Sequence, residues 1–299
     1  IRGCNQMKKA KGYVCTFISA LLYGVEPTVV EYAFEHGMTV AAASLMMTAF
    51  MLAGFGLTGL LSGVSFRVKP KQLLSLLLLG VLNGGTTMLL EGAYAYIPVG
   101  CATVIHFLYP TLTCMVMVLF FGIKLTVFRA AAMAASLTGL VLVTCGVSQG
   151  SPVGILLALG SSLTYLFYTV LTDRNRELAL LPMPVRMFFI NVGVMVTCVC
   201  VGVAQPGWGT LNPMTVLCVA VCACMFAGAM LFFAKGVDRV GATSAAFFSM
   251  FEPLVSMIFS TWVYRYHLTA KVILGCVPVL FAVFFIAVSD YRERIQGEA

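Results

Sequence analysis

The sequence predicts an all-α membrane protein with ten transmembrane helices, arranged as two inverted repeats of five. Composition is the first reason: 61% of the 299 residues are hydrophobic and 10% are charged, whereas about a quarter of the residues in a soluble domain are charged. The second reason is a series of apolar runs, each close to the roughly 20 residues that a membrane-spanning helix needs. The third is that the second half of the chain repeats features of the first half at a nearly constant offset.

Apolar runs bounded by Gly, Pro or charged residues mark the ten predicted spans. They cover about 12–34, 39–64, 71–97, 100–122, 127–147, 152–172, 183–204, 212–235, 241–264 and 271–290. The connections between them are short, and those at 97–100 and 148–151 are near-minimal turns. Neighbouring spans are therefore expected to run antiparallel.

The positions of Lys and Arg predict the orientation in the membrane. With the N-terminus in the cytoplasm, every one of the 18 basic residues except Arg265 and Lys271 falls in a cytoplasmic loop or terminus. Short cytoplasmic loops carry an excess of Lys and Arg, so we expect a multi-pass protein of a bacterial plasma membrane with both termini in the cytoplasm. Because these residues mark helix ends rather than one patch, the net charge of +7 does not indicate nucleic-acid binding.

The cysteines and the motif content argue against an enzyme. The eleven cysteines lie almost entirely inside apolar runs, where we expect small buried side chains rather than a disulfide framework. Cys218, Cys222 and Cys224 lie close together, but no His or acidic residue accompanies them, so we expect no metal site. The sequence shows neither a P-loop nor a nucleophile elbow. It therefore predicts no enzymatic activity and no cofactor.

Matched residues relate the two halves of the chain. Residues of the first span recur 142 positions later, and residues of the fourth span recur 143 positions later. The matched pairs are Gly12 with Gly154, Ser19 with Ser161, Tyr23 with Tyr165, Pro110 with Pro253, Leu125 with Leu268 and Thr126 with Thr269. We predict a first repeat at 7–148, a second at 151–291 and a short cytoplasmic tail at 292–299. Because five is an odd number of spans, the second repeat must be inverted, as in many secondary transporters.

Three stretches carry a resemblance to a known family: GATSAAFFSMFEP at 241–253, YIPVG at 96–100 followed by HFLYP at 106–110, and the Leu-Thr ends of the fourth and ninth spans. Across 12–290 the chain resembles the ten-helix EamA branch of the drug/metabolite transporter superfamily. The resemblance implies a basket of helices around a central cavity, which moves small metabolites by alternating access. Members often have Leu-Gly-Glu-x-Leu-Thr at these span ends. Here Ile123 replaces the acid in the first copy, and Arg265 and Tyr266 stand at the Gly-Glu positions of the second.

Three acidic residues, Glu26, Glu91 and Glu252, are predicted at membrane depth, where a carboxylate costs on the order of 3 kcal/mol and usually faces a polar cavity. Glu91 and His106 are equally far from the turn at 97–100, so we expect them at one depth on adjacent antiparallel helices. They can form a substrate or protonation site, because both side chains titrate in a useful range, or a satisfied polar pair between packed helices. Pro253 comes directly after Glu252 and can have a purely structural role, in which it bends the helix. Alternatively, Glu252 contacts the substrate directly.

Polar and aromatic side chains recur at steps of three and four residues in five of the predicted spans, so each set shares one helix face. The sets are Ser19, Tyr23 and Glu26; Asn83, Thr87, Glu91 and Tyr94; Thr103, His106 and Thr113 with Tyr109 beside them; Ser161, Tyr165, Tyr168 and Thr172; and Ser249, Glu252, Ser256 and Ser260. A single Ser or Thr can simply mediate helix packing, but five such faces favour a wetted cavity. Acids flanked by Tyr favour a cationic or zwitterionic ligand.

The sequence therefore favours a secondary transporter that moves a small metabolite, such as an amino acid or an amine, across the cytoplasmic membrane by alternating access, with export the expected direction. Uptake of a quaternary amine such as choline is the alternative. A membrane receptor or regulatory subunit is an alternative of a different class; it predicts an output domain or a long tail, and we expect the tail at 291–299 to be too short. The expected partners are the small-molecule substrate, the lipid bilayer and a proton or other coupling ion. Both a monomer and a homodimer are open.

Overall fold

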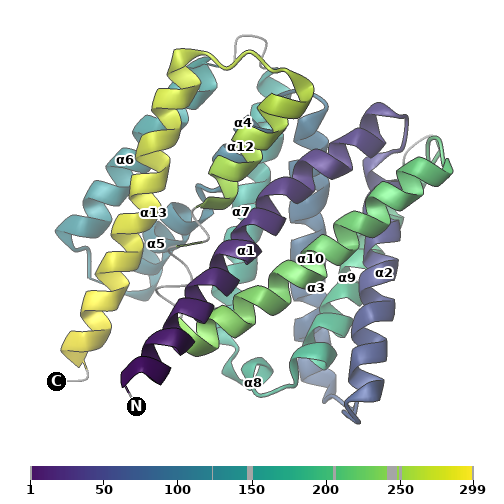
Figure 1. The fold of residues 1–299 in the computed structure, drawn as a ribbon, viewed down its shortest axis with the longest axis horizontal. Helices are drawn as coiled ribbons and strands as arrows, with labels where there is room; N and C mark the ends of the chain where they lie inside the picture. The colour runs from purple at the N-terminus through teal and green to yellow at the C-terminus, as the bar shows by residue number, and fades with distance from the viewer. Residues whose placement is uncertain are drawn as a thin grey trace. The chain divides into compact units, whose positions relative to one another are not determined.

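The computed structural model describes residues 2–122, 124–146, 151–204, 207–240, 248 and 251–297. These ranges are almost entirely helical (Figure 1), and the only β-bridge within them joins Met38 and Gly209. The helices are α1 (Arg2–Glu35), α2 (Val40–Leu61), α3 (Pro70–Tyr94), α4 (Val99–His106), α5 (Tyr109–Phe121), α6 (Val127–Gly146), α7 (Pro152–Arg174), α8 (Arg176–Ala179), α9 (Met183–Ala204), α10 (Pro213–Val240), α12 (Phe251–Tyr264) and α13 (Ala270–Gly297).

The helix bounds agree with the first eight predicted spans. Eight stretches of the described residues are long and apolar enough to cross a membrane, with α4 and α5 counted as one span. The helix α12 covers the later part of the ninth predicted span, whose residues 241–247, 249 and 250 lie outside the described residues, and α13 covers the tenth. The predicted turn at 148–151 also lies outside them, except for Ser151. The all-α membrane fold class is thus confirmed, whereas the count of ten spans stays a prediction.

The chain forms two compact units, each described here by itself. The first unit comprises residues 1–28, 93–159 and 225–299, and the second comprises residues 29–92 and 160–224. Each unit combines segments from both halves of the sequence. A compact unit is therefore not the same thing as a predicted repeat.

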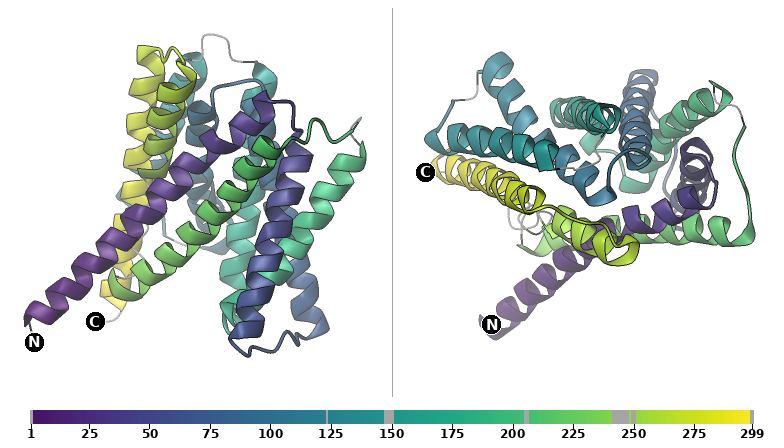
Figure 2. Two further views of the ribbon diagram at one scale, coloured as in Figure 1. Left: turned by 45° about the vertical axis from the view of Figure 1, so that its right-hand side comes forward. Right: turned by 90° about the horizontal axis from the view of Figure 1, so that it is seen from above.

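Close backbone crossings hold the first unit together. The helices α6 and α13 lie side by side (Figure 2), and glycines let them approach: a Cβ atom added to Gly139 would lie 2.6 Å from the carbonyl oxygen of Gly275. The helix α4 meets α12 in the same way at Gly100, where an added Cβ atom would lie 2.5 Å from the Cα atom of Met257. Small residues are enriched at such crossings because helices in lipid associate through close packing.

The second unit is built around α9. The helix α2 packs on it, and α3 crosses it where Gly80 meets Gly193; a Cβ atom added to Gly193 would lie 2.8 Å from the Cα atom of Gly80. A buried apolar cluster joins the same region, and its members are Leu76, Leu79, Leu178 and Ile190. In a membrane such side chains stabilise the fold through close packing. Since Leu178 comes from the short helix α8, the cluster also fixes the connection between α7 and α9.

Counterparts of the predicted repeats pack on each other within each unit. The second predicted spans of the two halves, α2 and α9, are in contact in the second unit. The fourth spans, α4 and α12, and the fifth spans, α6 and α13, are in contact in the first unit. The ends of the fourth spans also match: Gly122 after α5 and Arg265 after α12 both adopt a left-handed backbone, with φ of 70° and 55°. Such a φ is uncommon for a residue other than glycine.

Candidate functional site

A break in the fourth predicted span places two of the predicted site residues. The helix α4 ends at His106, and α5 begins at Tyr109 with Pro110 in its first turn. Proline has no backbone N–H to donate to the preceding turn, so a helix breaks ahead of it. The break between α4 and α5 is thus explained by Pro110. His106 is only 8% exposed, and its ring centroid lies 5.4 Å from that of Tyr109.

Glu252 lies in the first turn of α12 and is partly buried. It is close enough to act electrostatically on Tyr109, the residue that the predicted repeat makes its counterpart. The contact between α4 and α12 that brings them together includes a polar pair, because the hydroxyl oxygens of Thr103 and Ser256 lie 3.2 Å apart. The sequence alone suggested that Tyr109 and Glu252 were equivalent; the structure also places them within electrostatic range of each other.

The helix α1 contacts the first turn of α12 at Gly24. A Cβ atom added there would lie 2.8 Å from the carbonyl oxygen of Glu252 and 2.6 Å from the Cβ atom of Val255. The backbone of α1 therefore touches the first turn of α12, with Tyr23 and Glu26 on either side of the contact. Both are partly buried, and the ring of Tyr23 packs edge-on against Phe226 of α10, with centroids 5.2 Å apart.

These contacts define one cluster in the first unit, the Glu252 group. It consists of Tyr23, Glu26, His106, Tyr109 and Glu252, which come from α1, from the break between α4 and α5, and from α12. A sixth predicted residue of this unit, Tyr94, is the last residue of α3 and is buried. The structure thus places three of the ten predicted site residues, His106, Tyr109 and Glu252, close together, and Tyr23 and Glu26 lie within two residues of the contact that Gly24 makes with Glu252.

The second unit holds the other predicted residues. Glu91 is 8% exposed, and its Oε2 atom accepts a hydrogen bond of 2.7 Å from the hydroxyl of Ser44 on α2. Asn83 is partly buried on α3. The rings of Tyr165 and Tyr168 on α7 are stacked, with centroids 5.4 Å apart. Because Glu91 and His106 belong to different units, their pairing stays a prediction.

Two polar residues of the second unit were missed by the sequence analysis. Ser44 was not predicted, because its role depends on a contact between α2 and α3 that no local pattern encodes. Glu31 on α1 is a membrane-depth acid like Glu26 and is only 5% exposed. It lies five residues beyond Glu26 inside the first apolar run, so the signal that selected Glu26 could also have selected it.

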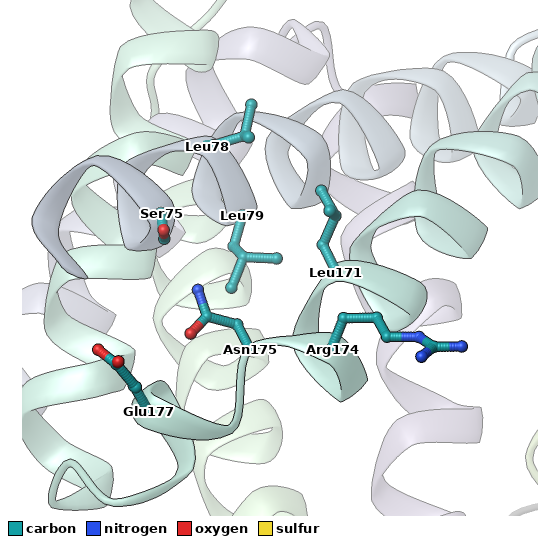
Figure 3. A pocket seen from close by; sticks show the side chains of 7 residues that line it. All are labelled: Ser75, Leu78, Leu79, Leu171, Arg174, Asn175 and Glu177. Atoms are coloured by element: carbon teal, nitrogen blue, oxygen red, sulfur yellow. The ribbon is translucent and has the colours of Figure 1, made fainter. Parts of the chain in front are cut away.

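The second unit also contains two neighbouring cavities. The larger, of about 500 Å³, lies where α3, α7 and α8 meet (Figure 3); it is lined by Ser75, Leu78, Leu79, Leu171, Arg174, Asn175 and Glu177. The smaller, of about 130 Å³, shares Leu79 with it and extends to Tyr168, Thr172 and Arg186. Among the predicted site residues, only Tyr168 lines either cavity.

Comparison with known proteins decides the family. The model of the EamA-like transporter family matches the chain twice, at residues 10–145 and at residues 152–288. The chain belongs to this family. The resemblance seen in the sequence is thus confirmed, and the chain is a membrane transporter of the drug/metabolite superfamily, in which two EamA units follow one another.

Structural comparison finds the same fold in a solved structure. A solved structure described only as the crystal structure of a protein superposes with a TM-score of 0.62 at 17% sequence identity. The alignment covers 93% of this chain and 97% of that one. At this identity the likeness shows the fold alone. No curated protein gives a significant match.

The described part of this EamA chain offers no set of metal ligands. Within it, no group of three or more His, Cys, Asp or Glu side chains could hold a metal ion. Ten of the eleven cysteines are free thiols, and seven of these are buried. What the Glu252 group can provide is a carboxylate next to aromatic faces and helix ends, which suits the binding of a small polar molecule.

Proposed function

We propose that this EamA protein is a secondary transporter that exports a small metabolite carrying an amino group, such as an amino acid or an amine. The observation that supports this most is the Glu252 group, in which a partly buried carboxylate lies beside Tyr109 at a helix break. An acid at membrane depth usually faces a polar pathway rather than lipid. Tyrosine faces beside the acid add cation–π attraction for an ammonium group.

The helix break suits a zwitterion in particular. The last carbonyl groups of α4, which ends at His106, give that helix end a partial negative charge, and the first N–H groups of α5 give its start a partial positive charge. Interrupted helices in transporters use these ends to bind the charged groups of a substrate. An amino acid would place its ammonium near Glu252 and the end of α4, and its carboxylate near the start of α5.

The packing of repeat counterparts supports alternating access. We propose ten spans in two inverted repeats, at 7–148 and 151–291, with both termini in the cytoplasm of a bacterium. A two-fold axis in the membrane plane brings equivalent helices together, as is seen for α2 with α9, α4 with α12 and α6 with α13. Inverted repeats of this kind open a central site to one side of the membrane and then to the other.

The acidic residues support the coupling of transport to an ion gradient. The chain has no nucleotide-binding motif, so an ion or solute gradient must supply the energy for transport. Glu91 accepts a hydrogen bond from Ser44 at a buried site of the second unit. We propose that it exchanges a proton, since a buried carboxylate with polar contacts can be used in either charge state.

A ligand screen on the detergent-purified protein tests the proposal. Ligands that bind only the folded state raise the melting temperature, so amino acids, quaternary amines, nucleosides and hydrophobic cations are compared. We expect amino-bearing compounds to raise it, and radiolabelled versions of them to be exchanged by liposomes containing the protein. Inward movement of choline alone would favour uptake instead of export. Binding without exchange would favour a receptor.

A further inference from the structure

The smaller cavity of the second unit lies outside the Glu252 group and has a chemistry of its own. It is formed by α3, α7, α8 and α9, and has a volume of about 130 Å³. Its apolar wall is made of Leu79, Leu178, Ala179, Met187 and Ile190. Polar atoms enter it only from Tyr168, Thr172 and Arg186 among the residues that line it. A cavity of this size holds a small polyatomic ion, because a single water needs only about 10–15 Å³.

The charge in this cavity is not balanced. Arg186 is partly buried, and its Nε atom is buried without a hydrogen-bond partner. In the described part of the chain no carboxylate forms an ion pair with it, and none lines the cavity; Glu177 lines the larger cavity next to it. A donor atom that is buried without a hydrogen-bond partner is unfavourable. An anion in the cavity would give the Nε atom of Arg186 an acceptor and would balance the charge of the guanidinium group.

A second donor is held beside the arginine. Tyr168 is close enough to Arg186 to interact with it electrostatically. Its ring stacks on that of Tyr165, with centroids 5.4 Å apart, which helps to hold the phenol in place. The cavity thus has a guanidinium and a phenol as donors. Arg186 is also the fourth residue of the 22-residue helix α9, whose N-terminus adds positive potential.

We propose that this cavity binds a small carboxylate ion. A guanidinium and a phenol can donate to the two oxygens of a carboxylate, and arginine binds this group well because of its planar fork. The leucine and isoleucine side chains that line the cavity suit a short alkyl group. A dianion such as phosphate would face one positive charge and an apolar wall, and a sugar acid would not fit the volume. The predicted orientation places this site near the cytoplasmic face.

Trifluoroacetate is the probe for this site, because its ¹⁹F signal broadens when it binds a large protein. The spectrum is recorded with the full-length protein in detergent at constant ionic strength, balanced with gluconate. We expect saturable broadening that acetate and propionate reverse at millimolar concentration, and that gluconate and phosphate do not. Chloride is included to separate a carboxylate site from a site for any small anion. Reversal by chloride as strong as by acetate would overturn the assignment to a carboxylate.

Substitutions locate the site. Arg186→Gln should abolish the broadening, and Tyr168→Phe should weaken binding about tenfold because one hydrogen bond to a charged group is lost. Arg174→Gln is the matched control: it removes an arginine that lines the neighbouring cavity, and binding should be unchanged. Unchanged broadening in Arg186→Gln would refute the proposal. If that variant does not fold, Arg186→Lys retains the charge but loses the fork, and full binding by it together with full binding by Tyr168→Phe would refute it equally.

Discussion

Glu252 is the residue on which the binding proposal depends most. Its counterpart in the first half of the sequence is Tyr109, so the two repeats place an acid and an aromatic ring at equivalent positions. The structure brings the two side chains into electrostatic range of each other. A single carboxylate next to a tyrosine binds an ammonium through both charge and cation–π attraction. The proposed site therefore has one acid and one aromatic ring at positions that the repeats make equivalent, because the two repeats differ in sequence there.

Replacing Glu252 with Gln should weaken the binding of amino-bearing substrates about tenfold or more, because an interaction with a charged group contributes about 1.5–3 kcal/mol. Affinity is measured from the rise in melting temperature as the ligand is titrated. Tyr109→Phe is the companion variant: it keeps the ring face and should reduce affinity less. Equal affinity of wild type and Glu252→Gln for every active amine would contradict the role given to this acid.

Variants of Glu91 and Ser44 distinguish a role of the Glu91 charge in transport from a role of this hydrogen-bonded pair in stability. The hydroxyl of Ser44 donates to the carboxylate of Glu91 at 2.7 Å, so Ser44→Ala should lower the stability by about 1 kcal/mol while proton-coupled exchange continues. Glu91→Gln keeps an acceptor for that hydroxyl but cannot exchange a proton. It should fold normally and lose the dependence of exchange on the proton gradient, measured in liposomes with an imposed pH difference. Retained proton dependence in Glu91→Gln would exclude it as the coupling site.

Arg265 is a residue under conformational strain. It has a φ of 55° in the position where the first repeat has Gly122, with a φ of 70°. A side chain in this conformation costs roughly 1–2 kcal/mol. Arg265→Gly should therefore stabilise the protein by about 1 kcal/mol, and Gly122→Ala should destabilise it by a similar amount. Denaturant unfolding in detergent measures both, and a loss of stability in Arg265→Gly would mean that its side chain has a stabilising contact.

At the scale of the helices, the break between α4 and α5 positions the site. Pro110→Ala restores a backbone N–H that can bond to the carbonyl of His106 and make the helix continuous. We expect slower hydrogen exchange around 107–110 and weaker substrate binding, because Tyr109 and His106 shift relative to α12. Pro278→Ala is the control, since Pro278 also lies within a helix of the first unit, but α13 continues through it. Unchanged exchange at 107–110 would show that the break does not depend on the proline.

Helix crossings at glycines are the main packing device. A Cβ atom on Gly193 would lie 2.8 Å from the Cα atom of Gly80, whereas one on Gly54 would have no atom within 4 Å. Gly193→Ala should thus destabilise the protein by about 1–3 kcal/mol through overpacking. Gly54→Ala should be neutral or slightly stabilising, because alanine is the better helix former. Equal melting temperatures of the two variants would contradict the close approach of α3 and α9.

The helices could be predicted from the sequence, whereas the contacts between residues far apart in the sequence could not. Length and hydropathy located the first eight spans, because a bilayer requires long apolar segments and little else. The bend at Pro110 was predictable from proline chemistry. The hydrogen bond between Ser44 and Glu91 joins residues 47 positions apart, and the cavity at Arg186 requires four helices to meet. Neither has a local signature, so both became visible only in the folded chain.

At the scale of the whole molecule, the two halves of the sequence are interleaved. Each compact unit takes segments from both halves, and equivalent helices pack in pairs in each unit. The family match in both halves agrees with the internal repeat seen in the sequence. A transporter built in this way can exchange an inward-facing state for an outward-facing one by exchanging the conformations of its repeats.

The most direct test of this account is counterflow in liposomes containing the purified protein and no nucleotide. The liposomes are loaded with an unlabelled amino-bearing compound that raises the melting temperature, and entry of the labelled compound is followed. We predict rapid, saturable entry that exceeds the final equilibrium level and is lost in Glu252→Gln. Counterflow of neutral or anionic solutes alone would contradict the proposed substrate class, and the absence of counterflow for every compound that binds would contradict transport by alternating access.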